Sequence, residues 1–345
     1  MSCRPCSCWR CCCRPPSSSC GIGGASWPAR RRQPDVELFN ALGDIFSSDA
    51  LYVSAFQLSV LFLFAGAGEW VAERAGTLNI SVEAMLLAGA FGAAAGHEIV
   101  AWSIAGLVGG CIAGLLIALI QANLSHRLTA NQFVVGLALN VLVLGLTAFL
   151  ATEIDLGPAR AEVVSVPALS GIPLVGEALF ARPWPAYFVY LLVPAVWWLV
   201  FRTRWGLEVR SVGENPQSAD VSGIDVNARR RQAIMLCGLT CGFGGAFIVL
   251  GQVGQFQSSI INGRGFIAIA AVIFGGWTLR GTVIGCVLFG LVEALTLATP
   301  VQGYRIDPVI LDVAPYVVAI AVVLLFATRV RQPRALAQPF VRGLT

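Results

Sequence analysis

Residues 201–231 read FRTRWGLEVRSVGENPQSADVSGIDVNARRR, a polar stretch with arginines near both ends that separates two apolar segments of membrane length. Asn215 can cap a helix start within it, and Pro216 suits the first helical position. Residues 217–222 are compatible with a helix, which Gly223 can end in the left-handed conformation. The pattern predicts a helix of about two turns, which needs a further surface to hold it because so short a helix is unstable alone.

The composition indicates that the chain spans a membrane several times. Of its 345 residues 57% are hydrophobic and only 12% are charged, and the mean hydropathy is +0.75. A soluble domain carries about 25% charged residues. Several apolar runs reach about 20 residues, the length at which a helix crosses the hydrocarbon layer. We therefore predict an all-α polytopic membrane protein.

About nine apolar segments, within a range of eight to ten, are predicted to cross the membrane. They comprise residues 51–70, 78–96, 99–121, 132–152, 186–201, 232–252, 265–276, 281–299 and 313–328. These segments define a transmembrane domain over residues 41–330, with a polar loop at 202–231 and a proline-rich loop at 153–185. Residues 331–345 form a tail.

The distribution of arginine predicts the orientation of these segments. The loop 202–231 and the tail 331–345 are rich in arginine and are placed in the cytoplasm, together with Glu73 and His126. The loop 153–185 then lies outside, as does the N-terminus. A GxVxGC pattern at residues 106–111 recurs at 281–286 with the opposite predicted direction, as in the inverted repeats of transporters. Glycine-rich helices also produce chance matches, so the repeat remains one of two interpretations.

The first 40 residues differ in composition from the rest. Seven of the 11 cysteines lie within the first 20 residues, and an arginine run follows at 30–32. Cys3 and Cys6 have the spacing of a metal site, but the segment has neither a periodic apolar pattern nor a signal-peptide core. Its arginines also conflict with an external N-terminus. We interpret residues 1–40 as disordered or as an extension from an overlong gene model, with the metal site as the alternative.

The chain contains no lysine, and all its 23 basic residues are arginine. A phosphate-binding loop of the GxxxxGK type and a Schiff-base lysine are therefore excluded. The two histidines, His97 and His126, fall on opposite sides of the predicted membrane, which disfavours a zinc site or a Ser-His-Asp arrangement. We expect no catalytic residue, no metal ligand and no cofactor in this chain, so that any ATP with its Mg²⁺ binds a partner subunit.

Polar residues inside the apolar segments are candidates for a translocation path, because such residues are expensive in a membrane. Asn79 and Glu83 are spaced i and i+4, which predicts one shared helix face in a broken helix that lines the path. The alternative is an interfacial helix start with Glu83 bonded to nearby backbone. Amides and aromatic rings can bind a sugar or a base, although a single amide more often serves helix packing. The candidate set is Asn79, Glu83, Asn131, Asn140, Gln255, Asn262 and Phe266.

Carboxylates at membrane depth keep a second function class open. Glu69, Glu83 and Glu293 lie in or beside apolar runs, as the carboxylates of a proton-coupled secondary transporter would. A membrane enzyme is disfavoured because the chain lacks lysine and a metal-ligand cluster, and a scaffold protein does not explain buried carboxylates.

Four stretches resemble the permease subunits of bacterial ABC importers in the branched-chain amino acid and simple-sugar superfamily. They are residues 73–83 (ERAGTLNISVE), 212–224 (VGENPQSADVSGI), 263–270 (GRGFIAIA) and 273–277 (IFGGW). The resemblance spans residues 40–330 and is greatest to the nucleoside or simple-sugar subgroup. Ser81 and Ala84 stand where the family often has glycine.

The resemblance implies a permease subunit that translocates a nucleoside or simple sugar by alternating access, driven by a separate ABC ATPase subunit. The ATPase-facing stretch corresponds to Gly213, Glu214, Asn215, Pro216, Ala219, Gly223 and Ile224. Further implied partners are a second homologous permease, in a heterodimer rather than a homodimer, and a periplasmic or lipid-anchored substrate-binding protein. The expected location is the bacterial inner membrane, surrounded by lipid, with a cytoplasmic C-terminus and no nucleic-acid partner.

Overall fold

A computed structural model of the chain describes residues 49–165, 179–301 and 332–341, with Val313, Val317 and Ile320 between the last two ranges. These residues belong to one compact unit, Ala41–Thr345. The expectations for residues 1–40 and for a span at 313–328 concern residues that fall wholly or mostly outside the described ranges, and both stay predictions.

The described chain is predominantly helical, which confirms the prediction of an all-α polytopic fold. The helices are α2 Asp49–Arg74, α3 Val82–Val100, α4 Ser103–His126, α5 Gln132–Glu153, α8 Phe188–Arg202, α9 Arg204–Glu214, α10 Pro216–Val221, α11 Val226–Phe247, α12 Arg264–Phe274 and α13 Leu279–Val301. A 3-10 turn, η1 Trp184–Tyr187, precedes α8, and a π-helical turn, η2 Ile248–Val253, extends α11. Among these elements, 6 helical stretches are long and apolar enough to cross a membrane.

Two loops contain more structure than the sequence predicted. Residues 202–231 hold α9 as well as the expected short helix, and α11 begins at Val226 rather than at residue 232. The sequence did not predict α9 because arginine, glutamate and serine side chains interrupt its apolar residues. The helix nevertheless has a buried face that includes Val209 and Val212. In the loop 153–185, β1 Val163–Ser165 pairs antiparallel with β2 Ala181–Pro183. Strands of three residues are too short to give a periodic signal.

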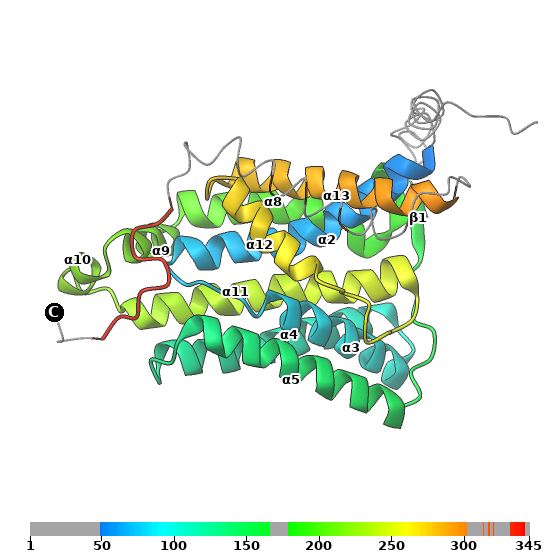
Figure 1. The fold of residues 1–345 in the computed structure, drawn as a ribbon, viewed down its shortest axis with the longest axis horizontal. Coiled ribbons are helices and arrows are strands. Elements are labelled where there is room, and N and C mark those ends of the chain that lie inside the picture. Colours follow the sequence, from blue (N-terminus) through cyan, green and yellow to red (C-terminus); the bar gives the residue numbers. More distant parts are fainter. Residues whose placement is uncertain are drawn as a thin grey trace, which may run out of the picture. The chain divides into compact units, whose positions relative to one another are not determined.

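The helix α11 forms the centre of the body and packs against α2, α3 and α4 (Figure 1). Small residues allow this close approach: a Cβ atom added to Gly242 of α11 would lie 2.5 Å from the carbonyl oxygen of Gly110 in α4. Helices in a membrane associate through such small-residue contacts because lipid offers no hydrophobic driving force. The glycine-rich segments therefore build the core that positions the polar groups described below.

The helical body has two distinguishable ends. Figure 1 shows α9, α10 and residues 332–341 together at one end, which we call the α10 end, and β1 at the other, the β1 end. His126 lines a cavity with Asp220 of α10, and the N–H of Ala337 donates to the carbonyl of Gly76. The α10 end thus gathers the segments that the arginine pattern placed on one side of the membrane.

Candidate functional site

Two helices begin inside the body instead of at its ends. After α2 ends at Arg74, residues 75–81 form a non-helical segment that leads to α3, which we call the first break. Residues 254–263 form a second break between η2 and α12. Glu83, in the first turn of α3, accepts hydrogen bonds from the backbone N–H groups of Gly263 and Gly265, at 2.7 Å each. The starts of α3 and α12 therefore lie side by side (Figure 1).

A carboxylate between two helix starts is electrostatically favourable. The N-terminus of each helix carries a partial positive charge, and its first N–H groups lack partners within the helix. Glu83 supplies acceptors for α12 while standing in the first turn of α3. Discontinuous helices of this kind form the substrate sites of many transporters, so the paired helix starts are the candidate functional site.

The first break runs from the α10 end into the body. The N–H of Leu78 donates to the side chain of Gln132, the first residue of α5, at 2.9 Å. Two residues later Ile80 bonds Asn140 on the same helix, and eight helical residues correspond to about 12 Å of depth. Non-helical backbone at membrane depth needs partners, because no water is there to satisfy it. Polar side chains of α2 and α5 provide them.

Asn140 is one of these partners. Its amide nitrogen donates to the carbonyl of Ile80 at 3.0 Å, and its amide oxygen accepts from the N–H of Ala84 at 3.0 Å. One side chain thus satisfies both the break and the first turn of α3. Asn140 was a predicted residue of the translocation path, whereas both of its side-chain polar atoms are bonded to backbone in this structure.

Asn79 lies in the first break and not on a helix face with Glu83, so the i, i+4 prediction is wrong. The Asn79 side-chain oxygen accepts from the N–H and the hydroxyl of Ser81, at 3.2 and 2.7 Å. A side chain that bonds the backbone two residues on competes with helix formation, which delays the start of α3 to Val82. The N–H of Asn79 donates to the buried Glu69 at 3.3 Å, and its amide nitrogen lies 3.4 Å from the sulfur of Cys237.

The remaining path candidates do not form one site. Asn131 is exposed and caps α5 by accepting from Phe133 and Val134 N–H groups. Gln255 is exposed at the β1 end, where it lines a cavity of about 380 Å³ with Glu153 and Asp155. Asn262 and Phe266 are exposed beside the backbone that Glu83 binds. Asn79, Glu83, Asn140, Asn262 and Phe266 surround the paired helix starts, and Asn131 and Gln255 lie elsewhere.

The predicted short helix is present at the α10 end. Asn215 caps α10 by accepting from the N–H of Ser218 at 3.0 Å, Pro216 is its first residue, and Gly223 has a φ of +84°. The helix ends at Val221, which is 90% exposed, whereas Ala219 on the opposite side is buried. A single exposed apolar residue is common on protein surfaces, so the contact of α10 with an ATPase subunit stays a prediction.

Other residues of the proposed ATPase-facing stretch connect α9 and α10 to the body. Gly213 lies so close to α2 that a Cβ atom there would stand 2.0 Å from the carbonyl oxygen of Arg74. The N–H of Ile224 bonds the carbonyl of Ala219 at 3.0 Å and closes the helix, while Glu214 is exposed. The close approach explains a glycine at position 213, where any side chain would push α9 away from α2.

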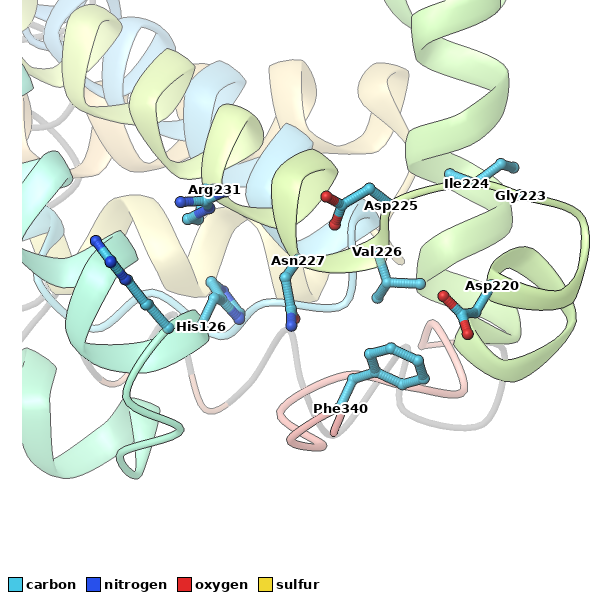
Figure 2. A pocket seen from close by; sticks show the side chains of 10 residues that line it. His126, Asp220, Gly223, Ile224, Asp225, Val226, Asn227, Arg231 and Phe340 are labelled. Atoms are coloured by element: carbon cyan, nitrogen blue, oxygen red, sulfur yellow. The ribbon is translucent and has the colours of Figure 1, made fainter. Parts of the chain in front are cut away.

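A cavity of about 450 Å³ opens beside α10 (Figure 2). Its lining joins the end of α4, the turn after α10, the start of α11 and the C-terminal segment. The lining residues are His126, Arg127, Asp220, Gly223, Ile224, Asp225, Val226, Asn227, Arg231 and Phe340. The cavity has charges of both signs and includes two residues of the predicted ATPase-facing stretch.

Sequence reasoning missed two arginines with defined roles. Arg264, at the start of α12, forms an ion pair with Glu293 of α13 at 2.6 Å. Arg230 is completely buried although it stands between Arg229 and Arg231. The run of three arginines was interpreted only as an orientation signal, and only the direction in which each side chain leaves α11 distinguishes the buried one.

Within the described ranges, no group of three or more His, Cys, Asp or Glu side chains could hold a metal ion.

Known proteins are similar to this sequence over most of its length. Residues 51–328 match the family described as "Branched-chain amino acid transport system / permease component". The putative glucose ABC transporter permease protein TsgC13 of Haloferax volcanii is 34% identical over 73% of this chain and 78% of its own length. The nucleoside ABC transporter permease protein NupC of Lactococcus lactis subsp. cremoris is 33% identical over 80% of this chain and 92% of its own.

A third relative is similar along nearly its whole length, and a solved structure shares the fold. The guanosine ABC transporter permease protein NupQ of Bacillus subtilis is 31% identical over 89% of this chain and 99% of its own length. A chain of PsaBC from Streptococcus pneumoniae in complex with Fab shares the fold at a TM-score of 0.51 and 13% identity, covering 86% of this chain and 98% of that chain. The extent of the family match decides the matter: this multi-pass membrane protein belongs to the family of branched-chain amino acid transport system permease components.

Proposed function

We propose that the chain is the permease subunit of an ABC importer that translocates a nucleoside or a simple sugar. The observation that carries the proposal is near full-length similarity to NupC and NupQ, whose names specify nucleoside and guanosine transport, together with similarity to a putative glucose permease. The role of the chain is alternating access without covalent chemistry. ATP is bound and hydrolysed by a separate subunit.

The charges at the paired helix starts favour a neutral substrate over an amino acid. Arg264 is paired with Glu293, and Glu83 is bonded to two backbone N–H groups. An amino acid needs an unpaired cation and an unpaired anion to bind its carboxylate and its ammonium group. These charges already have partners within the protein, whereas Asn262 and the ring of Phe266 are exposed beside them and suit a polar ring.

The α10 end supports docking of the ATPase subunit. A capped helix that exposes Val221 at its tip, beside a cavity of mixed charge, offers an apolar anchor surrounded by polar groups. In the proposed importer this end and the C-terminus face the cytoplasm, as the arginine pattern predicts. A substrate-binding protein then docks at the β1 end, and a second, related permease completes the path in a heterodimer.

The proton-coupled alternative is less consistent with the geometry. Glu69 accepts from the N–H of Asn79, Glu83 from Gly263 and Gly265, and Glu293 from Arg264. A carboxylate that relays protons must give up its partner in each cycle, and here each partner stabilises a break or the start of a helix. Their structural roles explain these carboxylates without proton transport.

The test is uptake by the assembled complex. The tagged full-length chain is purified from its native membranes with the proteins that bind it, and is reconstituted into vesicles with ATP supplied on the α10 side. We expect ATP-dependent uptake of radiolabelled guanosine or glucose that an uncoupler does not abolish, with leucine transported much more slowly. Uptake that collapses with an uncoupler but survives ATP depletion would establish the secondary transporter instead.

A further inference from the structure

Residues 332–341, which we call the strap, lie beyond residues 51–328 that match the family, yet they are firmly held. The N–H of Ala335 donates to the carbonyl of Gly213 at 3.0 Å, at the C-terminal end of α9. The N–H of Ala337 donates to the carbonyl of Gly76 in the first break at 3.1 Å. Ala335 and Ala337 are two positions apart, and through them the strap bonds both the ATPase-facing stretch and the first break.

The side chain of Arg230 also binds both the strap and the first break. Its Nε donates to the carbonyl of Ala75 at 3.2 Å, and its two Nη atoms donate to the carbonyls of Gln338, at 2.7 Å, and Ala335, at 3.4 Å. The residue is 0% exposed. A buried charge is costly unless its donors are used, and a planar guanidinium can serve several acceptors in fixed directions. Arg230 therefore fixes where the strap meets the break.

Phe340 connects the strap to α10. Its side chain is buried in a small apolar cluster with Val212 of α9, Ala219 of α10 and Val226 of α11. Figure 2 shows the ring beside Val226, at the edge of the cavity that α10 also lines. Ala219 belongs to the ATPase-facing stretch, so the strap contacts the surface of α10 that faces away from the exposed Val221.

The backbone of Gly76 is closely packed against the strap and Arg230. Gly76 has a φ of +83°, and a Cβ atom there would lie 3.0 Å from the carbonyl oxygen of Ala335 and 3.0 Å from Nη2 of Arg230. Asn79, whose N–H is bonded to Glu69, follows three residues later. Three residues of extended chain span at most about 10 Å, so Gly76 and Asn79 lie close together. A displacement at Gly76 must therefore reach Asn79 and the start of α3.

We propose that Arg230 and the strap are positioning elements that transmit movement of α10 to the first break, and through it to the paired helix starts. The proposal rests on the proposed function, in which an ATPase subunit moves α10. Closely packed contacts respond to a small shift as a unit, which makes a rigid link a suitable transmitter. A static role, in which the strap only seals the α10 end, predicts assembly defects but no change in the ratio of ATP hydrolysed to substrate moved.

The experiment compares Arg230→Met, Arg230→Lys and Phe340→Ala with a matched control, Arg334→Met, which removes an exposed arginine of the strap itself. The full complex is reconstituted, and the ratio of ATP hydrolysed to substrate transported is measured for each variant. We expect assembly and ATP hydrolysis to persist while the ratio rises at least tenfold in Arg230→Met and about threefold in Phe340→Ala. Arg230→Lys should recover part of the coupling, and Arg334→Met should stay within twofold of the unmodified protein.

A second readout follows amide hydrogen exchange of residues 75–81 with and without the bound ATPase subunit. Binding at α10 should change exchange in this segment severalfold in the unmodified protein and leave it unchanged in Arg230→Met. Unaltered coupling ratios in Arg230→Met and Phe340→Ala, or equal exchange responses with and without Arg230, would overturn the proposal. An absence of ATP-driven uptake in the unmodified complex would instead refute the proposed function, and the exchange comparison would still decide whether α10 and the break are linked.

Discussion

The two breaks are held in different ways, although both lead to a helix that starts inside the body. The first break is fixed by hydrogen bonds with three side chains: Gln132 and Glu69 accept from its backbone N–H groups, and Asn140 donates to its backbone carbonyl. The second break is anchored mainly by apolar side chains, because Phe256, Ile260 and Ile261 are buried. Its amides, Gln255, Gln257 and Asn262, are exposed. The side chains that bond the first break thus serve the fold, whereas the side-chain amides of the second break are exposed and are the groups that we test for contact with a ligand or a partner.

Glu83 joins the two breaks, and its removal should have the largest effect. Glu83→Ala leaves the N–H groups of Gly263 and Gly265 without their acceptor and removes the link between α3 and α12. We expect a loss of about 3 kcal/mol of stability, since hydrogen bonds to a charged group are the strong ones, and loss of most transport. The measurement is thermal unfolding in detergent together with ATP-driven uptake. Glu153→Ala, which removes an exposed carboxylate, is the control for stability only; equal stability of the two variants would contradict the role of Glu83.

Glycines of α5 provide a matched test of how tightly the first break is packed. In Gly136→Ala, the new Cβ atom would lie 2.8 Å from Cβ of Ile80, whereas in Gly145→Ala it would meet nothing within 4 Å. We expect Gly136→Ala to cost about 2 kcal/mol, as overpacking does, and Gly145→Ala to be neutral or slightly stabilising. Chemical denaturation of both variants checks the difference. If the two variants have equal stability, the backbone of the first break can move to accommodate the added methyl group. The contrast with the second break then fails.

The first break shows why part of the site could not be predicted from the sequence. The spacing of Asn79 and Glu83 fits a helix as well as it fits a break, because local pattern rules are the same for both. The groups that decide between them, Gln132 and Asn140, are more than fifty residues away. The exposure of Asn131 and the bonds of Asn140 likewise follow from tertiary contacts that no local pattern contains.

The short helix α10 is the opposite case. A cap at Asn215, Pro216 at the first position and Gly223 at the end are all local signals, and the structure places the helix between them. The six long apolar stretches of the described residues were also predicted, because length and hydropathy alone identify a membrane helix. Arg230 could not be separated from Arg229 and Arg231, since its burial depends on which side of α11 meets the strap.

Substitution of Gly223, the residue that ends α10, should reduce stability less than Gly136→Ala does. At Gly223 a Cβ atom meets nothing within 4 Å, so Gly223→Val acts only through the left-handed backbone conformation, with a φ of +84°. We expect a cost of about 1 kcal/mol or more, and ATP hydrolysis that no longer drives uptake. Gly223→Asn, which tolerates this conformation, should retain coupling. Normal uptake by Gly223→Val would count against the coupling role of α10.

The exposed amides of the second break should show the smallest effect on stability. Gln255→Ala removes an exposed side chain, and we expect a change in stability within about 0.5 kcal/mol. If these amides meet the substrate or the binding protein, the concentration required for half-maximal uptake should rise severalfold while the maximal rate is kept. A variant as unstable as Gly136→Ala would show that the second break depends on its polar groups as the first one does. Uptake unchanged at every concentration would exclude a contact of Gln255 with the substrate or the binding protein and direct attention to Asn262, near the end of the second break, and to Phe266 in α12.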